Sequence, residues 1–290
     1  KLARAGFCSV IAGTREISEI HERSRNCIYL GRLPGNTGRR PGDRRLLEDF
    51  ARRNTALFFL HDEGAFYLRG EYENAVRRVY PEELLDLPVL QRMFFWGEAQ
   101  REVLDPGRDE EKLVVTGAPR FDLCRDKYSH IDREHRDRLR NQYGHFLLVC
   151  GRFAAVNMVW DDPSALGTRS YEIRVEGGAT RDLSRNEILE SMFDAWGKVC
   201  REFSEFVPAI ARLAMDFPDV NLVLRPHPAE RMSFYKEAFA HFPNVFVDKD
   251  GDVRALIRAC DAVVHSECTT AVEAEIAEKP NVNFRPAAGI

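Results

Sequence analysis

An apolar run that ends abruptly in a rigid polar turn decides the fold. It reads Leu222-Val223-Leu224-Arg225-Pro226-His227-Pro228. Its first three residues suit a buried strand, and the two prolines cannot donate to a strand ladder. We predict a parallel strand whose carboxyl end presents Arg225 and His227, where ligands of α/β sheets bind. An arginine can grip a phosphate and a histidine can protonate a leaving group; the alternative is a proline-rich turn without a ligand.

A second strand-to-helix segment lies further along the chain. A strand at residues 262–264 leads into a helix at 270–278 through three hydroxyl residues, Ser266, Thr269 and Thr270. The hydroxyls are predicted to cap the helix, whose free N–H groups and dipole favour a phosphate. Glu273, one turn into the helix, is predicted to accept from the hydroxyls of a ribose. Alone, such a helix with an exposed glutamate is common and uninformative. Its position after the motif at residues 225–228 makes the combination a more specific sign of a phosphate site.

The first half of the chain carries a candidate general base. A strand at residues 56–60 is followed by His61 and then by Asp62, Glu63 and Gly64. Such a carboxylate can take a proton from an acceptor hydroxyl, and the glycine permits close approach of a substrate. The alternative is an ordinary acidic turn.

Four further residues are weaker candidates for the substrate cleft. Gly117 and Arg120 follow a strand at residues 113–116, and Arg152 and Asn157 follow a strand at 146–150. Arg120 could instead pair with a nearby aspartate on the surface.

Short apolar runs alternate with amphipathic stretches along the chain, which predicts βαβ units and parallel sheets. A charged helix at residues 131–143 separates two such series. We predict an α/β fold of two Rossmann-like, doubly wound domains facing a central cleft. The acceptor domain would span residues 1–143, with a first strand at 7–12 and an earlier strand missing. The nucleotide-sugar domain would span residues 144–290.

Composition restricts the class of protein. The net charge of −4 and the pI near 6.1 argue against a nucleic-acid binder. No apolar run approaches the roughly 20 residues of a membrane span. The seven widely spaced cysteines indicate buried free thiols in a reducing compartment, with a catalytic cysteine or a zinc site as the alternative. We expect a cytoplasmic protein, with peripheral association at the inner face of the membrane or in an assembly complex as an option.

The order of these motifs resembles the second domain of GT-B transferases of bacterial surface polysaccharides. These include capsule Kdo transferases, bacterial sialyltransferases and CDP-glycerol glycerophosphotransferases. Residues 225–228 and 266–273 carry the most specific part of the resemblance, and residues 62–64 resemble the acid-acid-glycine motif of the sialyltransferases. Residues 95–97 and 117–122 resemble surface carbohydrate biosynthesis proteins. The resemblance covers most of residues 54–290.

The resemblance implies transfer of Kdo or a related nonulosonate from a CMP-activated donor to a glycan or lipid-linked acceptor. His227 would contact the departing phosphate, and Glu273 the ribose. Arg225, Pro228 and the three hydroxyl residues would line the donor site, and Asp62 or else Glu63 would be the base. No metal or other cofactor is expected, because helix N-termini, arginine and histidine neutralise the phosphate.

Three other activities stay open at this point. A CDP-glycerol or CDP-ribitol phosphotransferase would use a similar donor site. A UDP-sugar 2-epimerase shares the two-domain form, but usually shows a Ser-Gly-Gly run that is absent here. The third alternative is a non-catalytic subunit that binds a glycan or nucleotide. The presence of Asp62 together with His227 favours an enzyme instead.

Overall fold

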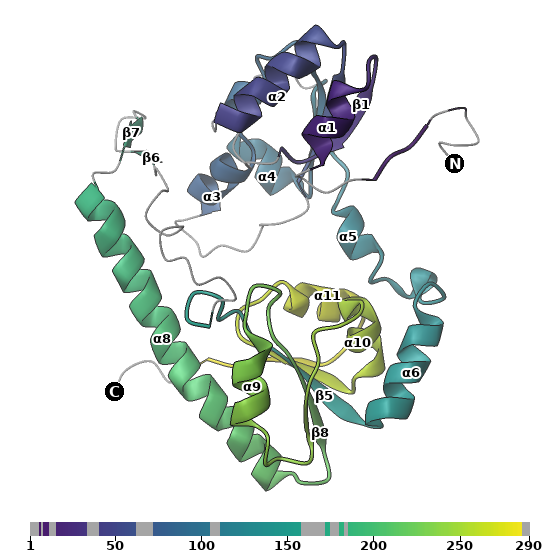
Figure 1. Ribbon diagram of the computed structural model, residues 1–290, viewed down its shortest axis with the longest axis vertical. Helices are drawn as coiled ribbons and strands as arrows, with labels where there is room; N and C mark the ends of the chain where they lie inside the picture. The colour runs from purple at the N-terminus through teal and green to yellow at the C-terminus, as the bar shows by residue number, and fades with distance from the viewer. Residues whose placement is uncertain are drawn as a thin grey trace. The chain divides into compact units, whose positions relative to one another are not determined.

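The computed structural model describes residue 6 and residues 8–11, 16–33, 41–61, 72–104, 111–157, 172–174, 180–182 and 185–285. The chain divides into two compact units, Lys1–Pro119 and Arg120–Ile290; Figure 1 shows their helices and strands. The predicted base residues Asp62 and Glu63, with Gly64, lie outside the described residues. Their roles therefore stay predictions.

The first unit is built on four parallel strands in the order β1-β2-β3-β4. Its elements are α1 (Ile17–Glu22), β1 (Ile28–Gly31), α2 (Pro41–Arg52), β2 (Ala56–Leu60), α3 (Tyr72–Val79), η2 (Glu82–Leu84), β3 (Leu90–Phe95), α4 (Glu98–Val103) and β4 (Leu113–Val115). The strand predicted at residues 7–12 is wrong for its described part, because residues 8–11 form no strand. Val10 and Ile11 are exposed there, so no core holds them.

One hydrophobic core supports this sheet. Leu57 and Phe59 of β2 point to the same face, as the two-residue period of a strand requires, and pack with Phe50 of α2. At the carboxyl ends of β2 and β3, the indole Nε1 of Trp96 donates to the carbonyl of His61 over 2.9 Å. The two strand ends are thereby tied together.

The second unit contains a five-stranded parallel sheet in the order β11-β10-β5-β8-β9. Its elements are α5 (Pro119–Asp122), η3 (Asp126–Tyr128), α6 (Arg133–Tyr143), β5 (Phe146–Cys150), β6 (Glu172–Arg174), β7 (Thr180–Asp182), α8 (Arg185–Asp216), β8 (Asn221–Arg225), α9 (Met232–Ala238), β9 (Val245–Val247), α10 (Val253–Ala259), β10 (Ala262–His265), α11 (Thr270–Ile276) and β11 (Asn281–Asn283). Strands β6 and β7 form a separate antiparallel pair. The strand order reverses between β5 and β10, as in a Rossmann sheet.

Both faces of this sheet are covered. On one face Leu148 of β5 and Val223 of β8 pack with α6, α10 and α11. On the other face Val149 and Leu224 pack with α8 and α9. Alternate residues of each strand therefore feed two cores, which explains why these strands read as continuous apolar runs.

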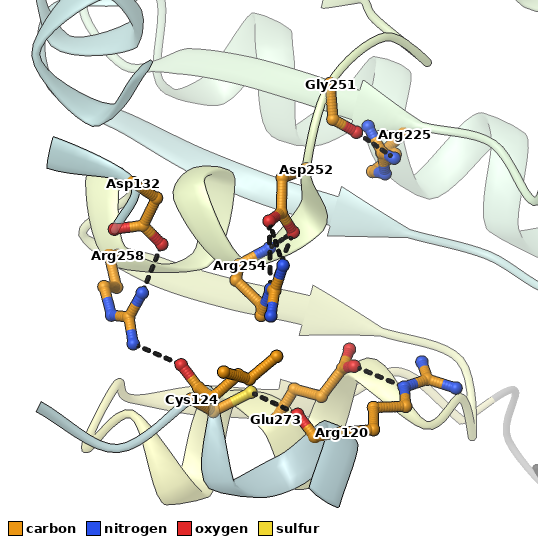
Figure 2. A network of polar contacts seen from close by, with 10 residues as sticks. Arg120, Cys124, Asp132, Arg225, Gly251, Asp252, Arg254, Arg258 and Glu273 are labelled. Carbon is orange, nitrogen blue, oxygen red and sulfur yellow. Dashed lines mark hydrogen bonds and ion pairs between the residues drawn. The ribbon is translucent and has the colours of Figure 1, made fainter. Parts of the chain in front are cut away.

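The boundary between the units falls after Pro119, not after Tyr143 as predicted. A side chain of α10 explains the difference. Arg258 is ion-paired with Asp132 just before α6, and its NH2 donates to the carbonyls of Leu123 over 2.6 Å and Arg125 over 3.1 Å (Figure 2). The segment from Arg120 to α6 is thus attached to the second unit.

Helix α8 changes its surroundings along its length. Phe206, Ile210 and Ala214 in its second half are buried in the core, whereas Phe193 and Trp196 in its first half are exposed. Pro208 lies inside the helix, within its buried half. Within the described ranges, no helix combines the length and the apolar character that crossing a bilayer requires.

Candidate functional site

The carboxyl ends of β5, β8 and β10 meet at one edge of the second sheet, because these strands are parallel neighbours. Gly151 follows β5 at this edge, and a Cβ there would lie 2.8 Å from the ring of Phe153, so only glycine fits. The backbone N–H of Ser266, after β10, donates to the carbonyl of Cys150 over 3.1 Å. This edge contains the switch point where ligands of such sheets bind.

A buried glutamate fixes the loop after β8. Glu230 is 0% exposed. Its Oε1 accepts from the backbone N–H groups of His227 and Phe153, each over 3.0 Å, and its Oε2 accepts from the hydroxyl of Tyr235. This carboxylate therefore joins the ends of β5 and β8. The sequence analysis missed Glu230, whose one signal is a carboxylate shortly before the buried Tyr235.

The imidazole of His227 is oriented by its own loop. Its Nδ1 accepts a hydrogen bond from the backbone N–H of Ala229 over 3.1 Å. An accepting Nδ1 carries no proton, so the neutral ring carries its proton on Nε2. The side chain is exposed, as is the following Pro228. His227 therefore presents an N–H donor to solvent at the carboxyl edge of β8.

Arg225 is bound to a neighbouring loop. It is the last residue of β8, and its two terminal nitrogens donate to the carbonyls of Asp250 over 3.0 Å and Gly251 over 2.9 Å. Figure 2 shows the guanidinium turned toward this loop. The planar fork that suits a phosphate also suits two neighbouring carbonyls. Arg225 thus holds the β9–α10 loop, and its role toward a donor phosphate stays a prediction.

The start of α11 also differs from the expectation. Thr269, at the N-cap, has helical dihedral angles and makes no side-chain cap. The backbone N–H groups of Ala271, Val272 and Glu273 donate to the carbonyls of Cys268 and Thr269 over 3.1–3.3 Å. These three N–H groups, which were predicted to bind phosphate, are therefore already hydrogen-bonded to carbonyls of the turn before the helix. Thr270 begins the helix, and Ser266 is buried.

Glu273 is not the exposed residue that its helix position suggested. Its side chain is 2% exposed, and its Oε1 accepts from the Nε of Arg120 over 2.9 Å. Its Oε2 is buried and has no hydrogen-bond partner among the described residues. Figure 2 shows the pair linking α5 to α11. Glu273 therefore retains one free acceptor, and Arg120 belongs to the second unit's site.

Three weaker candidates, Arg152, Asn157 and Gly117, lie at different places in the chain. Arg152 lies at the switch point, with its NH2 2.6 Å from the Oε2 of Glu267. Asn157 is buried, and its amide donates to the carbonyl of Arg231 over 3.0 Å, so it braces the loop after β8. Gly117 belongs to the first unit, where it adopts a φ of +80° that favours glycine. Its role stays a prediction.

Two thiols of the second unit are unsuited to nucleophilic chemistry. Burial raises the pKa of Cys150, at the end of β5, and raises the pKa of Cys124 to about 11. Both are therefore protonated near neutral pH. In the described part of the chain, no three His, Cys, Asp or Glu side chains gather as a metal site would require.

Comparison with known proteins identifies the fold. Neither a protein-family model nor a curated protein sequence matches the chain. A UDP-GlcNAc 2-epimerase from Neisseria meningitidis, bound to UDP-GlcNAc, matches with a TM-score of 0.53 and 12% identity over 96% of this chain and 67% of that one. MnaA of S. aureus, in complex with UDP, matches with a TM-score of 0.53 and 13% identity over 96% and 64%.

The chain has a GT-B-type α/β fold. It spans about two thirds of the length of these two structures. The wall teichoic acid polymerase TagF matches more loosely, with a TM-score of 0.41 and 13% identity over 80% of this chain and 50% of that one. At such identities the likeness concerns the GT-B fold alone, and function has to be argued from the site.

Proposed function

We propose that the chain is a nucleotide-sugar-dependent glycosyltransferase whose second unit binds the donor at the carboxyl edge of its sheet. The observation that carries the proposal is the setting of His227. Its backbone is anchored to the buried Glu230, and its exposed ring presents Nε2–H beside the switch point. A fixed donor at this place can stabilise negative charge that develops on a departing phosphate.

Two further groups support a nucleotide at this edge. The buried Oε2 of Glu273 can accept from a ribose hydroxyl. The Nε of Arg120 is fixed on Glu273, and its terminal nitrogens have no partner in the described part of the chain. We propose a CMP-activated donor such as Kdo, a glycan or lipid-linked acceptor, and no need for a metal. Asp62 or Glu63 remains the proposed base.

The second candidate is a UDP-sugar 2-epimerase. It is favoured by the solved structure of the same fold that holds UDP-GlcNAc. An epimerase and a glycosyltransferase would use the same donor edge, so the nucleotide that binds, and not the location of binding, separates them.

A thermal-shift panel with CMP, CDP, UMP, UDP, GDP and ADP tests the proposal. A nucleotide at a hundredfold excess over its Kd stabilises the native state by ~2.7 kcal/mol. We expect CMP to raise the Tm, and His227→Ala to abolish the rise. His241→Ala is the matched control, because His241 is an exposed histidine of the same unit that precedes β9.

The outcomes separate the candidates. Stabilisation by UDP alone would favour the epimerase, and the panel repeated in EDTA tests metal independence. Nucleotide binding without turnover of any sugar nucleotide would indicate a non-catalytic subunit. If no nucleotide raises the Tm, or if His227→Ala and His241→Ala behave alike, the proposed donor site is wrong.

A further inference from the structure

Two arginines at the switch point of the second unit share one carboxylate. The NH2 of Arg152, just after β5, lies 2.6 Å from the Oε2 of Glu267. The NH2 of Arg285, just after β11, lies 3.5 Å from its Oε1. Glu267 itself follows β10 by two residues. The ends of three strands therefore converge on one carboxylate at the place where ligands of doubly wound sheets bind.

The backbone of Glu267 is unfavourable for its residue type. Its φ is +44°, in the left-handed region that residues other than glycine avoid. Its N–H donates to the Oδ1 of Asn283 over 3.3 Å. Its side chain and that of Arg152 are partly exposed, so the ion pair adds little to stability. A pair that adds little to stability, at the edge where ligands of such sheets bind, indicates a function other than folding.

We propose that the carboxylate of Glu267 occupies the position of an anionic ligand group, and that a phosphate-bearing ligand displaces it to bind Arg152 and Arg285. A carboxylate whose two oxygens each face a guanidinium imitates a phosphate in the same place. Arg152 keeps a second partner, since its NH2 lies 3.8 Å from Glu202. It therefore stays oriented when Glu267 leaves.

The charges define the class of ligand. Departure of Glu267 leaves Arg285 and Arg152 to be matched, because Glu202, which stays near Arg152, is shared with Lys198 at 3.9 Å. The best ligand therefore offers two negative charges close together, as a terminal phosphate or a pyrophosphate does. The identification of that ligand as a nucleotide rests on the proposed function, because His227 lies at the same edge. The anion site itself does not depend on the nucleoside.

Titration calorimetry with CMP, UDP and inorganic pyrophosphate tests the proposal. Glu267→Gln keeps the side-chain size but removes the competing charge. Because like charges in contact are strongly unfavourable, we expect each ligand to bind roughly tenfold tighter. Arg152→Ala removes a charge-assisted donor and is expected to weaken binding roughly tenfold. Glu267→Gly, which relieves the backbone strain, should resemble Glu267→Gln.

Glu278→Gln provides the matched control. Glu278 is an exposed glutamate of the same unit with a φ of +55°, and it makes no ion pair within the described residues. Its substitution should leave all three Kd values unchanged. If wild type binds CMP and Glu267→Gln binds it no tighter, the displacement proposal is wrong and the proposed function stands. Tighter binding of pyrophosphate without binding of any nucleotide would retain the anion site and remove the proposed function. Absence of binding in every variant would contradict both.

Discussion

Two arginine–carboxylate pairs in the second unit have the same chemistry and opposite settings. The side chains of Arg258 and Asp132 are 8% and 6% exposed, whereas those of Arg152 and Glu267 are 39% and 29% exposed. Loss of one partner from a buried pair leaves a charge without compensation, but water and salt replace the partner of an exposed pair. The first pair therefore determines the path of the chain, and the second can exchange partners.

The largest expected effect tests the buried pair. Arg258→Ala leaves the carboxylate of Asp132 buried and should lower the free energy of unfolding of the second unit by about 3–5 kcal/mol. Urea denaturation followed by circular dichroism measures the change. Arg136→Ala is the control, because Arg136 pairs only with the exposed Asp137 at 3.7 Å among the described residues. Equal stability of the two variants would contradict a structural role for Arg258.

An intermediate effect is expected for Arg120, whose side chain is 37% exposed although that of Glu273 is 2% exposed. Arg120→Ala removes the one described donor to this carboxylate and should cost about 2 kcal/mol. A double-mutant cycle with Glu273→Gln measures the coupling between the two residues. A coupling near zero would show that Glu273 does not need Arg120.

Arg152 should contribute the least of the three arginines to stability. Arg152→Ala is expected to change the free energy of unfolding by less than about 1 kcal/mol, because both side chains of the pair are accessible to water. The same denaturation experiment at low and high salt measures this. A loss as large as that of Arg258→Ala would remove the distinction between the two pairs.

The smallest expected effect concerns a buried histidine, whose burial outweighs the opposing charge of Glu267. Burial lowers the pKa of His265, the last residue of β10. The unfolded chain therefore takes up this proton first as the pH falls below about 6.5. His265 should leave stability unaffected above that pH and reduce it progressively below, until the folded protein is protonated as well. His265→Gln should flatten the pH dependence of the Tm, whereas His241→Gln should leave it unchanged.

The sequence predicted helices and strands well where interactions within a few residues determine where they begin and end. The apolar run at residues 222–224 and the prolines after it placed the end of β8 to within one residue, because both effects act within the segment. The roles of long side chains were less predictable. The partners of Arg225 lie on the loop at residues 250–251, and a strand-end arginine gives no local sign of which loop it will reach.

The remaining errors have the same origin in distant contacts. The helix at residues 133–143 was read as a boundary because of its charge, yet Arg258 attaches the preceding segment to α10. Glu230 was not predicted, since burial of a carboxylate depends on donors from three other positions. The capping prediction at Thr269 failed because the preceding turn already satisfies the first N–H groups.

Burial divides α8 into two dynamic regimes. Phe206, Ile210 and Ala214 in its second half are held by the core, whereas Phe193 and Trp196 nearer its start are exposed. Pro208 lies within the buried half and removes one N–H donor from the helix of 32 residues. We therefore expect the amides of the second half to exchange with deuterium only when the sheet opens, and those of the first half to exchange by local fraying. A helix that is continuous in geometry should behave as two cooperative units in hydrogen exchange.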